Sequence, residues 1–465
     1  MQIHFWGAAR TVTGSAHYLR VNGHTLLLDC GLFQGRRKDT YTVNRSFRFP
    51  PITIDAVLLS HAHIDHSGNL PNLAKHGYQG PIYATVATVH LCELMLKDSA
   101  HIQESDVLFV NKRRQKRGQP LVEPLYTLED AEMAIDLFEK VDYEQSFPVV
   151  PGVRATFVDA GHILGSAAIV LDIEEGGRTK RLWFSGDIGR PNMPILNDPV
   201  MPYDADFLIM ESTYGDRPHP PYENACEELK QVLSKTLNRG GKVIIPAFAV
   251  GRTQELVYAI HRMMDQREIP SVPVFVDSPL AVDVTDVFRR HQDDFDEEAQ
   301  EMLQNDVHRA ALGFDRLTYI RSVEESKELN RRQDSMIIIS ASGMMEVGRV
   351  LHHLRHNIHD PKNTLLIVSW QAPHTLGRRM IEGVSEVKIY GEVYENKIEV
   401  RSIQGFSAHA GQDLLVEYAL SLKDRVKQIF LVHGEKRGAN PLRDLLRENG
   451  LQNVHFPRRN DSITF

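Results

Sequence analysis

The stretch LLSHAHIDHSGNL, residues 58–70, places three histidines and an aspartate directly after an apolar run. The apolar run predicts a buried strand, and residues two apart at a strand end share a face, so His61 and His63 can point to one place. The turn that follows can bring Asp65 and His66 round to the same place. Imidazole and carboxylate ligands without a thiolate suit zinc, with manganese or iron as alternatives. We therefore expect a metal site where this strand ends.

Three further segments repeat the order of an apolar run, a histidine or aspartate, and a glycine nearby. They are VDAGHILGS with His162, WFSGDIG with Asp187 and IFLVHGE with His433. Seven ligands are the number expected for two ions. His61, His63 and His162 would hold one ion, Asp65, His66 and His433 the other, and Asp187 would bridge them. Two ions about 3.5–4 Å apart can lower the pKa of a shared water and stabilise a displacement at phosphorus, so hydrolysis is the expected reaction.

The composition is that of an ordinary globular protein, with 42% apolar and 25% charged residues. At 465 residues the chain is too long for one typical core, so two lobes are expected. No secretory leader and no apolar run of membrane-spanning length is recognisable, which predicts a cytoplasmic protein without a membrane contact. Cys30, Cys92 and Cys226 are too few and too widely spaced for a disulfide framework or a cysteine metal site.

The net charge of −8 argues against a protein that coats nucleic acid non-specifically, but it leaves room for a local basic surface. The clearest basic run is NKRRQKRG, residues 111–118. Such a run is either a solvated loop or helix end, or a patch that contacts phosphates. The sequence leaves both interpretations open.

The pattern along the chain predicts an α/β protein with an inserted lobe. Short strands dominate to about residue 210, with a hairpin turning at Asn22-Gly23 and a helical stretch at about 86–145. Helices then alternate with very apolar strands, which favours a largely parallel sheet. We expect a first domain over 1–210 and 396–465, and an inserted domain over 211–395.

The histidine and aspartate motifs at His61 to His66, His162, Asp187 and His433 resemble those of the metallo-β-lactamase superfamily. That resemblance implies an αβ/βα sandwich with a dinuclear site at the strand ends. The long stretch between Asp187 and His433 indicates an inserted lobe.

Glu211 in IMESTYGDR and His409 in GFSAHAG, together with His433, resemble the β-CASP group of nucleases. The resemblance implies that Glu211 orients His409, which would be the general acid, and that Asp65 also takes part in catalysis. Histidine at position 433 is typical of members that act on RNA, whereas valine is typical of the DNA-repair branch. Arg252, Ser340, Ser342 and Ser407 are the expected substrate-binding residues.

The sequence thus predicts a zinc-dependent ribonuclease that cuts single-stranded RNA by a two-metal mechanism, between the sandwich and the inserted lobe. A DNA nuclease, a thioester or lactone hydrolase and a non-catalytic scaffold are the alternatives. Endonuclease and 5′ exonuclease action are both open, and a homodimer would be unsurprising.

Overall fold

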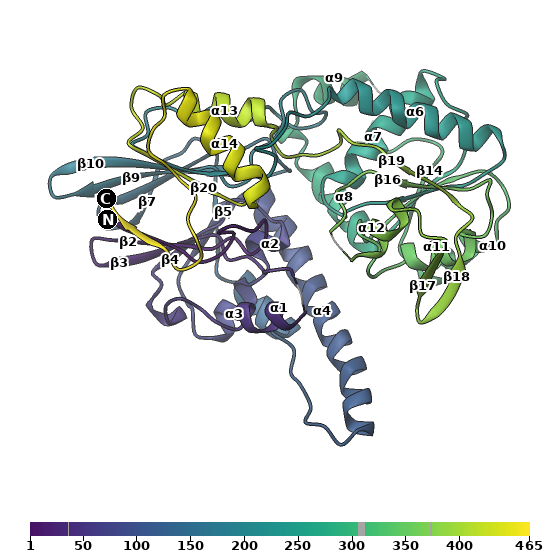
Figure 1. Cartoon of the computed structure of the whole chain (residues 1–465), viewed down its shortest axis with the longest axis horizontal. Coiled ribbons are helices and arrows are strands. Elements are labelled where there is room, and N and C mark those ends of the chain that lie inside the picture. The colour runs from purple at the N-terminus through teal and green to yellow at the C-terminus, as the bar shows by residue number, and fades with distance from the viewer. Residues whose placement is uncertain (36, 306–311, 373) are drawn as a thin grey trace. The chain divides into compact units, whose positions relative to one another are not determined.

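A computed structural model describes residues 1–35, 37–305, 312–372 and 374–465 (Figure 1). The chain forms two compact units. The first unit consists of Met1–Pro191, Asn197–Pro218 and Ala408–Phe465, and the second of Asn192–Leu196 and His219–Ser407. The domain boundaries expected after residues 210 and 395 stay predictions, and they lie several residues before the corresponding limits of these units.

The first unit contains two stacked sheets. One has the order β22-β1-β2-β3-β4-β5-β6 and the other β21-β20-β11-β10-β9-β8-β7. The strands of the first sheet are β1 Gln2–Phe5, β2 His17–Val21, β3 His24–Leu28, β4 Ala56–Leu58, β5 Ile82–Thr85, β6 Phe138–Val141 and β22 Ser462–Thr464. Those of the second are β7 Phe147–Val150, β8 Val153–Asp159, β9 Ala167–Glu175, β10 Arg178–Phe184, β11 Phe207–Glu211, β20 Gln428–Val432 and β21 Val454–His455.

Helices cover the outer faces of both sheets (Figure 1). They are α1 Arg37–Asn44, α2 Ile64–Ser67, α3 Leu70–Lys75, α4 Val86–Lys116, α5 Leu128–Ile135, α13 Gln412–Leu420 and α14 Lys436–Glu448, with a 3₁₀ turn at Pro51–Thr53. α13 and α14 lie over the second sheet, while α1, α3 and α4 lie on the side of the first (Figure 1). This arrangement is the expected αβ/βα sandwich.

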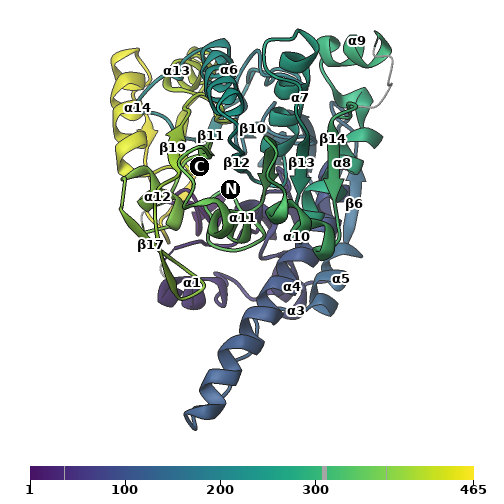
Figure 2. The same ribbon diagram turned by 90° about the vertical axis from the view of Figure 1, so that its right-hand side faces the viewer.

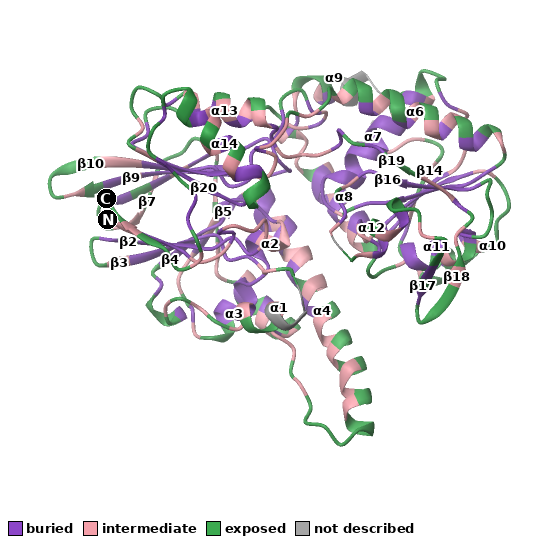
Figure 3. Cartoon of the chain, viewed as in Figure 1, coloured by how far each residue is buried: buried purple, intermediate pink, exposed green. Residues whose placement is uncertain are grey.

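The core between the sheets is formed by apolar side chains from both inner faces. Ile3 and Leu26 of the first sheet and Phe157 and Phe430 of the second belong to one buried cluster. Full burial of each such side chain contributes about 1.5–3 kcal/mol. The buried strands stand out against the exposed outer helix faces in Figure 3.

Local sequence signals explain the hairpin but not every element of this unit. Asn22 and Gly23 have φ of 52° and 86°, the left-handed conformation that a two-residue hairpin turn requires, as predicted. The prediction of a helical stretch as far as about residue 145 was wrong at its C-terminal end. Phe138–Val141 is a strand, β6, because it pairs in parallel with β5 at the sheet edge.

The second unit has a six-stranded sheet of order β14-β13-β15-β12-β16-β19. Its pairings are all parallel, as the alternating pattern predicted. The strands are β12 Val243–Pro246, β13 Val274–Asp277, β14 Leu317–Ile320, β15 Ile337–Ser340, β16 Thr364–Ile367 and β19 Glu399–Ser402, with a separate hairpin of β17 Glu386–Ile389 and β18 Glu392–Glu395. Because β19 pairs with β16, this unit continues past residue 395.

The helices of the second unit flank its sheet. They are α6 Tyr222–Asn238, α7 Arg252–Asp265, α8 Pro279–Arg290, α9 Glu297–Asn305, α10 Val323–Arg331, α11 Val350–Asn357 and α12 Leu376–Ile381, with a 3₁₀ turn at Gln292–Asp294. Among the helices that the structure describes in either unit, none is both long and apolar enough to cross a membrane.

α4 differs from the other helices because half of it leaves the sandwich. Its first half packs on the first unit, and the remainder extends away from it in both views (Figures 1 and 2).

Candidate active site

The candidate ligands lie at one edge of the sandwich because the strands that carry them run in the same direction. β10 pairs in parallel with β11, and β11 with β20. Parallel strands end at the same edge of a sheet, so Asp187 after β10, Glu211 at the end of β11 and His433 after β20 come together. β8 is antiparallel to β9, and β9 to β10, so His162, just after β8, reaches the same edge.

The structure brings all seven predicted ligands together within the first unit. His61, His63, His162 and Asp187 form one group whose ligand atoms all lie within 4.8 Å of one another, and Asp65, His66 and His433 form another. Asp187 contacts both groups. Its Oδ2 atom lies 3.6 Å from Nε2 of His61 and 3.3 Å from Nε2 of His66.

The spacing within the first group fits a metal ion. Nδ1 of His63 lies 3.2 Å from Nε2 of His61 and 3.3 Å from Nε2 of His162. Two nitrogens bound to one tetrahedral zinc ion at about 2.05 Å are about 3.4 Å apart. Both separations from His63 therefore match those that such an ion would impose.

Two buried polar atoms of the candidate ligands have charged neighbours but no hydrogen bond. Nε2 of His66 and Oδ1 of Asp187 make no hydrogen bond within the described part of the chain. Buried polar atoms of this kind are rare, because an unsatisfied group pays its desolvation cost in full. A cation held between Asp65, His66 and His433 would give Nε2 of His66 a partner, and Nε2 of His433 lies 3.3 Å from Oδ2 of Asp65.

Burial keeps several of these imidazoles neutral, the form in which histidine binds metal. Burial lowers the pKa of His63 to about 4 and that of His61 and His162 well below its usual range. Burial would raise the pKa of Asp187, but His433, His66 and His409 outweigh it and hold that pKa well below the usual range. The first group therefore offers neutral nitrogen and ionised carboxylate. In the second group, burial would lower the pKa of His66, but Asp187 and Asp29 outweigh it and raise that pKa well above its usual range.

Asp29 contacts a candidate ligand histidine and was missed by the sequence analysis. Its Oδ2 atom lies 2.7 Å from Nδ1 of His66, and its carboxylate also accepts hydrogen bonds from the Ser15 hydroxyl and the Ser60 backbone N–H. A carboxylate on the far nitrogen of a ligand histidine fixes the ring orientation. The signal was present, since LLLDCG, residues 26–31, repeats the order of apolar run, aspartate and glycine.

Two glycines let the loops of the site pack closely. A Cβ atom on Gly31 would lie 1.7 Å from the carbonyl oxygen of Asp65, and one on Gly189 would lie 1.8 Å from that of Gly161. Any side chain at these positions would push the loops apart. The two glycines therefore allow the backbones of the loops that carry Asp65, His162 and Asp187 to pack closely.

Glu211 and His409 form the predicted pair beside the candidate metal ligands. Nδ1 of His409 lies 3.1 Å from Oε1 of Glu211, and that oxygen also accepts a hydrogen bond of 2.7 Å from the Ile188 N–H. Glu211 is fully buried, whereas the His409 side chain is 23% exposed. Burial lowers the pKa of His409, but Glu211 and Asp187 outweigh it and raise the pKa to about 9. The two carboxylates thus favour the protonated form of His409.

The predicted substrate-binding residues lie in the second unit, where each has a protein partner. Arg252 is buried, forms an ion pair with Glu255 and lies 5.6 Å from the centre of the Phe406 ring. The Ser340 hydroxyl donates to the Asp277 carbonyl and the Ser342 hydroxyl to the Val347 carbonyl, and Ser407 is partly buried. Their contacts with a substrate stay predictions.

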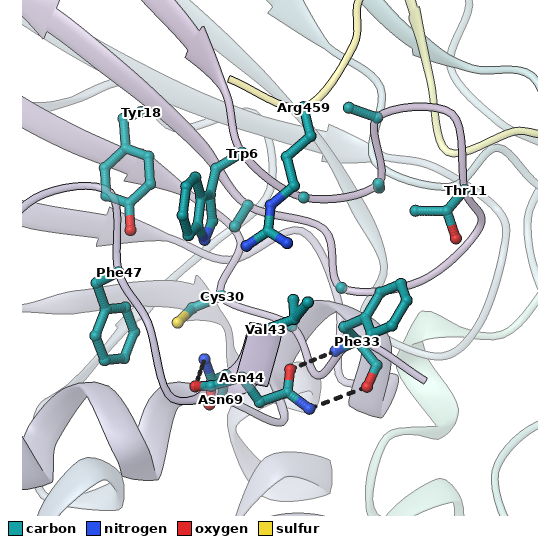
Figure 4. Close-up of a pocket in the computed structure, with 16 residues that line it drawn as sticks. Trp6, Thr11, Tyr18, Cys30, Phe33, Val43, Asn44, Phe47, Asn69 and Arg459 are labelled. Carbon is teal, nitrogen blue, oxygen red and sulfur yellow. Dashed lines mark hydrogen bonds between the residues drawn. The ribbon is translucent and has the colours of Figure 1, made fainter. Parts of the chain in front are cut away.

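The first unit contains a small cavity whose lining includes four aromatic side chains (Figure 4). Trp6, Tyr18, Phe33 and Phe47 contribute to its lining, and the Arg459 guanidinium lies 4.1 Å from the centre of the Trp6 ring. Gly31, which packs on the Asp65 backbone, is also part of the lining. The cavity therefore borders a residue that packs against the Asp65 loop, but none of the seven predicted ligands lines it.

Comparison with known proteins identifies the class to which this fold and site belong. Residues 9–247 match the metallo-β-lactamase superfamily, residues 253–380 the Beta-Casp domain and residues 394–457 the Zn-dependent metallo-hydrolase RNA specificity domain. The chain belongs to the metallo-β-lactamase superfamily and, within it, to the β-CASP proteins. It is a metal-dependent hydrolase, and the superfamily implies that it binds divalent metal.

Individual relatives span the whole chain. Ribonuclease TTHA0252 of Thermus thermophilus is 39% identical over 100% of both chains. Transcription termination factor FttA of Methanocaldococcus jannaschii is 31% identical over 100% of this chain and 71% of its own length. A crystal structure of a protein of unknown function from Enterococcus faecalis V583 shares the fold, with a TM-score of 0.56 at 12% identity over 100% of this chain and 99% of that one.

Proposed function

We propose that this protein is a zinc-dependent ribonuclease that hydrolyses phosphodiester bonds of single-stranded RNA at a site with two metal ions. The observation that carries the proposal is the position of the His409–Glu211 pair directly beside the converging ligands, with Nδ1 of His409 only 3.9 Å from Oδ2 of Asp187. The match to an RNA specificity domain and the likeness to a protein named as a ribonuclease support RNA as the substrate.

The residues divide into two ligand sets with one shared carboxylate. His61, His63 and His162 would hold one ion, Asp65, His66 and His433 the other, and Asp187 would bridge them. When bound, such ions supply Lewis-acid activation of the attacking water and charge stabilisation at the phosphoryl group. Zinc suits the donor set, and manganese or iron are the alternatives.

Side chains of the protein would donate the proton that the leaving oxygen needs and position the attacking water. The water oxygen bonds to phosphorus, the bond to the leaving oxygen breaks, and His409 gives its proton to that oxygen. Glu211 holds the imidazole in orientation and stabilises its protonated form. Asp65, whose side chain is 24% exposed, would accept a hydrogen bond from the attacking water. The proton that this water loses passes to solvent, and solvent returns a proton to His409 after the products leave. The products are one phosphate-ended and one hydroxyl-ended fragment.

The test is cleavage of end-labelled single-stranded RNA and DNA of the same sequence by zinc-loaded protein. We expect the RNA to be cut and the DNA to be largely spared, with fragment sizes that distinguish internal from terminal attack. Asp187→Ala should abolish cleavage, and Asp424→Ala, an exposed aspartate of the same unit, should not.

Two other outcomes would change the proposal. If DNA is cut as well as RNA, the substrate assignment is wrong. If neither polymer is cut although about two metal ions are bound per chain, a small-molecule substrate such as a thioester or lactone takes the place of RNA. The expected homodimer is tested separately by light scattering, and the expected cytoplasmic location by cell fractionation.

A further inference from the structure

α4 joins the candidate active site to a distant, exposed tip. The helix has 31 residues, which corresponds to about 46 Å at 1.5 Å per residue. Its base is anchored beside the His162 loop, where the hydroxyls of Thr85 and Thr88 donate to the Gly165 carbonyl over 2.6 and 2.7 Å. From His101 to Lys116 no residue of the helix is buried (Figure 3).

The tip carries a concentrated positive charge. Its cations are Lys112, Arg113, Arg114, Lys116 and Arg117, and no acidic residue occurs between Val107 and Val122. None of the five forms an ion pair with the described part of the chain. The chain as a whole carries a net charge of −8, whereas this segment is locally positive. Such a cluster attracts a polyanion.

The tip is also held in a defined shape. The Asn111 side chain donates to the Val122 carbonyl over 2.9 Å and accepts from the Val122 N–H over 3.0 Å. The Arg114 guanidinium donates to the Pro120 carbonyl. These bonds fasten the returning segment to the helix end, so the cations are displayed on a folded element and not on a fraying terminus.

Exposed apolar and aromatic surface accompanies the cations. Phe109 is 57% exposed, and the Arg113 guanidinium lies 4.4 Å from the centre of its ring. Leu108, beside it, is 64% exposed. An aromatic ring next to guanidinium groups is a surface on which unpaired bases stack while the cations bind the phosphates.

We propose that the α4 tip, defined as residues 107–122, is a second RNA-binding surface, remote from the metal centre. The inference rests on the proposed ribonuclease function. RNA fits better than an acidic protein, because cations without a carboxylate in the tip match a phosphate backbone and the exposed aromatic ring can stack on an unpaired base. An RNA long enough to reach from the site along α4 would bind both places, whereas a short one would bind only the site.

The test compares two quadruple variants. The tip variant carries Lys112→Gln, Arg113→Gln, Lys116→Gln and Arg117→Gln, and it retains Arg114 because that residue fastens the tip. The control carries Arg48→Gln, Arg178→Gln, Lys423→Gln and Arg458→Gln, which are exposed cations of the same unit. Affinities for RNA oligonucleotides of increasing length are measured by fluorescence anisotropy at several salt concentrations, with Asp187→Ala added to all proteins so that the RNA stays intact.

We expect the tip variant to bind long RNA at least about 10-fold more weakly, with the slope of log affinity against log salt reduced by up to about 2.8, since each phosphate contact on a single strand contributes about 0.7. Short RNA should be bound and, without the Asp187→Ala change, cut as by the wild type. Equal losses in the tip and control variants would overturn the inference, as would a tip variant that changes only the oligomeric state. Failure of the wild type to cut any RNA would instead overturn the proposed function.

Discussion

Nδ1 of His409 lies 3.1 Å from Oε1 of Glu211, although 198 positions separate the two residues in the chain. Glu211 ends a buried strand of the second sheet, and His409 lies in the loop that leads into α13. The pair is therefore assembled by the return of the chain to the first unit after the inserted one.

His409→Ala should lower kcat for RNA cleavage by about 10²–10⁴-fold, because the leaving oxygen loses its proton donor. Zinc content, measured by atomic emission, should stay at the wild-type level because His409 is outside the predicted ligand set. Rate and metal content should be compared in one preparation. A variant that loses both would show that His409 supports the ligands instead of the proton transfer.

Asp29→Asn should weaken zinc binding by about 10–100-fold, the usual effect of losing a carboxylate partner of a ligand histidine. Asn is the suitable replacement because Asp29 has a φ of 58°, a conformation that Asn tolerates. Competition with a zinc chelator measures the affinity. Asp142→Asn, at an exposed position, is the control, and equal affinities in both variants would refute the role of Asp29.

Tyr418→Phe should destabilise the protein by about 1–3 kcal/mol, because it leaves a buried indole N–H without an acceptor. Nε1 of Trp183 in β10 donates to the Tyr418 hydroxyl over 2.7 Å, and both residues are buried. Chemical denaturation measures the loss. Tyr203→Phe, at a half-exposed tyrosine, should have little effect.

Glu399→Gln should reduce stability near neutral pH but not in acid. Burial raises the pKa of Glu399, but hydrogen bonds from Lys235, Arg239 and Arg401 outweigh it and hold the pKa at about 2. Because the folded-state pKa is below the ordinary value of 4.5, the stabilisation is complete above pH 4.5 and is lost as the pH falls toward 2. The cost near neutrality should be about 1 kcal/mol, since solvent screens such pairs.

Denaturation curves of wild type and Glu399→Gln from pH 7 down to pH 3 measure this dependence. The two stabilities should converge below pH 4.5. Glu386→Gln, at an exposed glutamate of the same unit, should show no such convergence. A stability difference independent of pH would contradict the assignment.

The sequence by itself determined the features that depend on local pattern. Asn22-Gly23 specified its hairpin because few residues adopt two consecutive positive φ angles. The apolar strands of the second unit specified a parallel sheet because both of its faces are covered. The motif from His61 to His66 indicated a metal site because three histidines and an aspartate close together after one strand rarely serve a purely structural role.

Only the tertiary structure decided the features that depend on distant partners. Phe138–Val141 is a strand because β5 offers a free edge, and Asp29 supports His66 because β3 and β4 end side by side. Arg252 appeared free to bind a phosphate in the sequence, yet the folded chain pairs it with Glu255. The sequence left open whether the basic run at 111–118 is merely solvated or contacts phosphates, and its position on the exposed half of α4 favours the second interpretation. Local propensity encodes the elements, but contacts between residues far apart in the chain decide what each side chain meets.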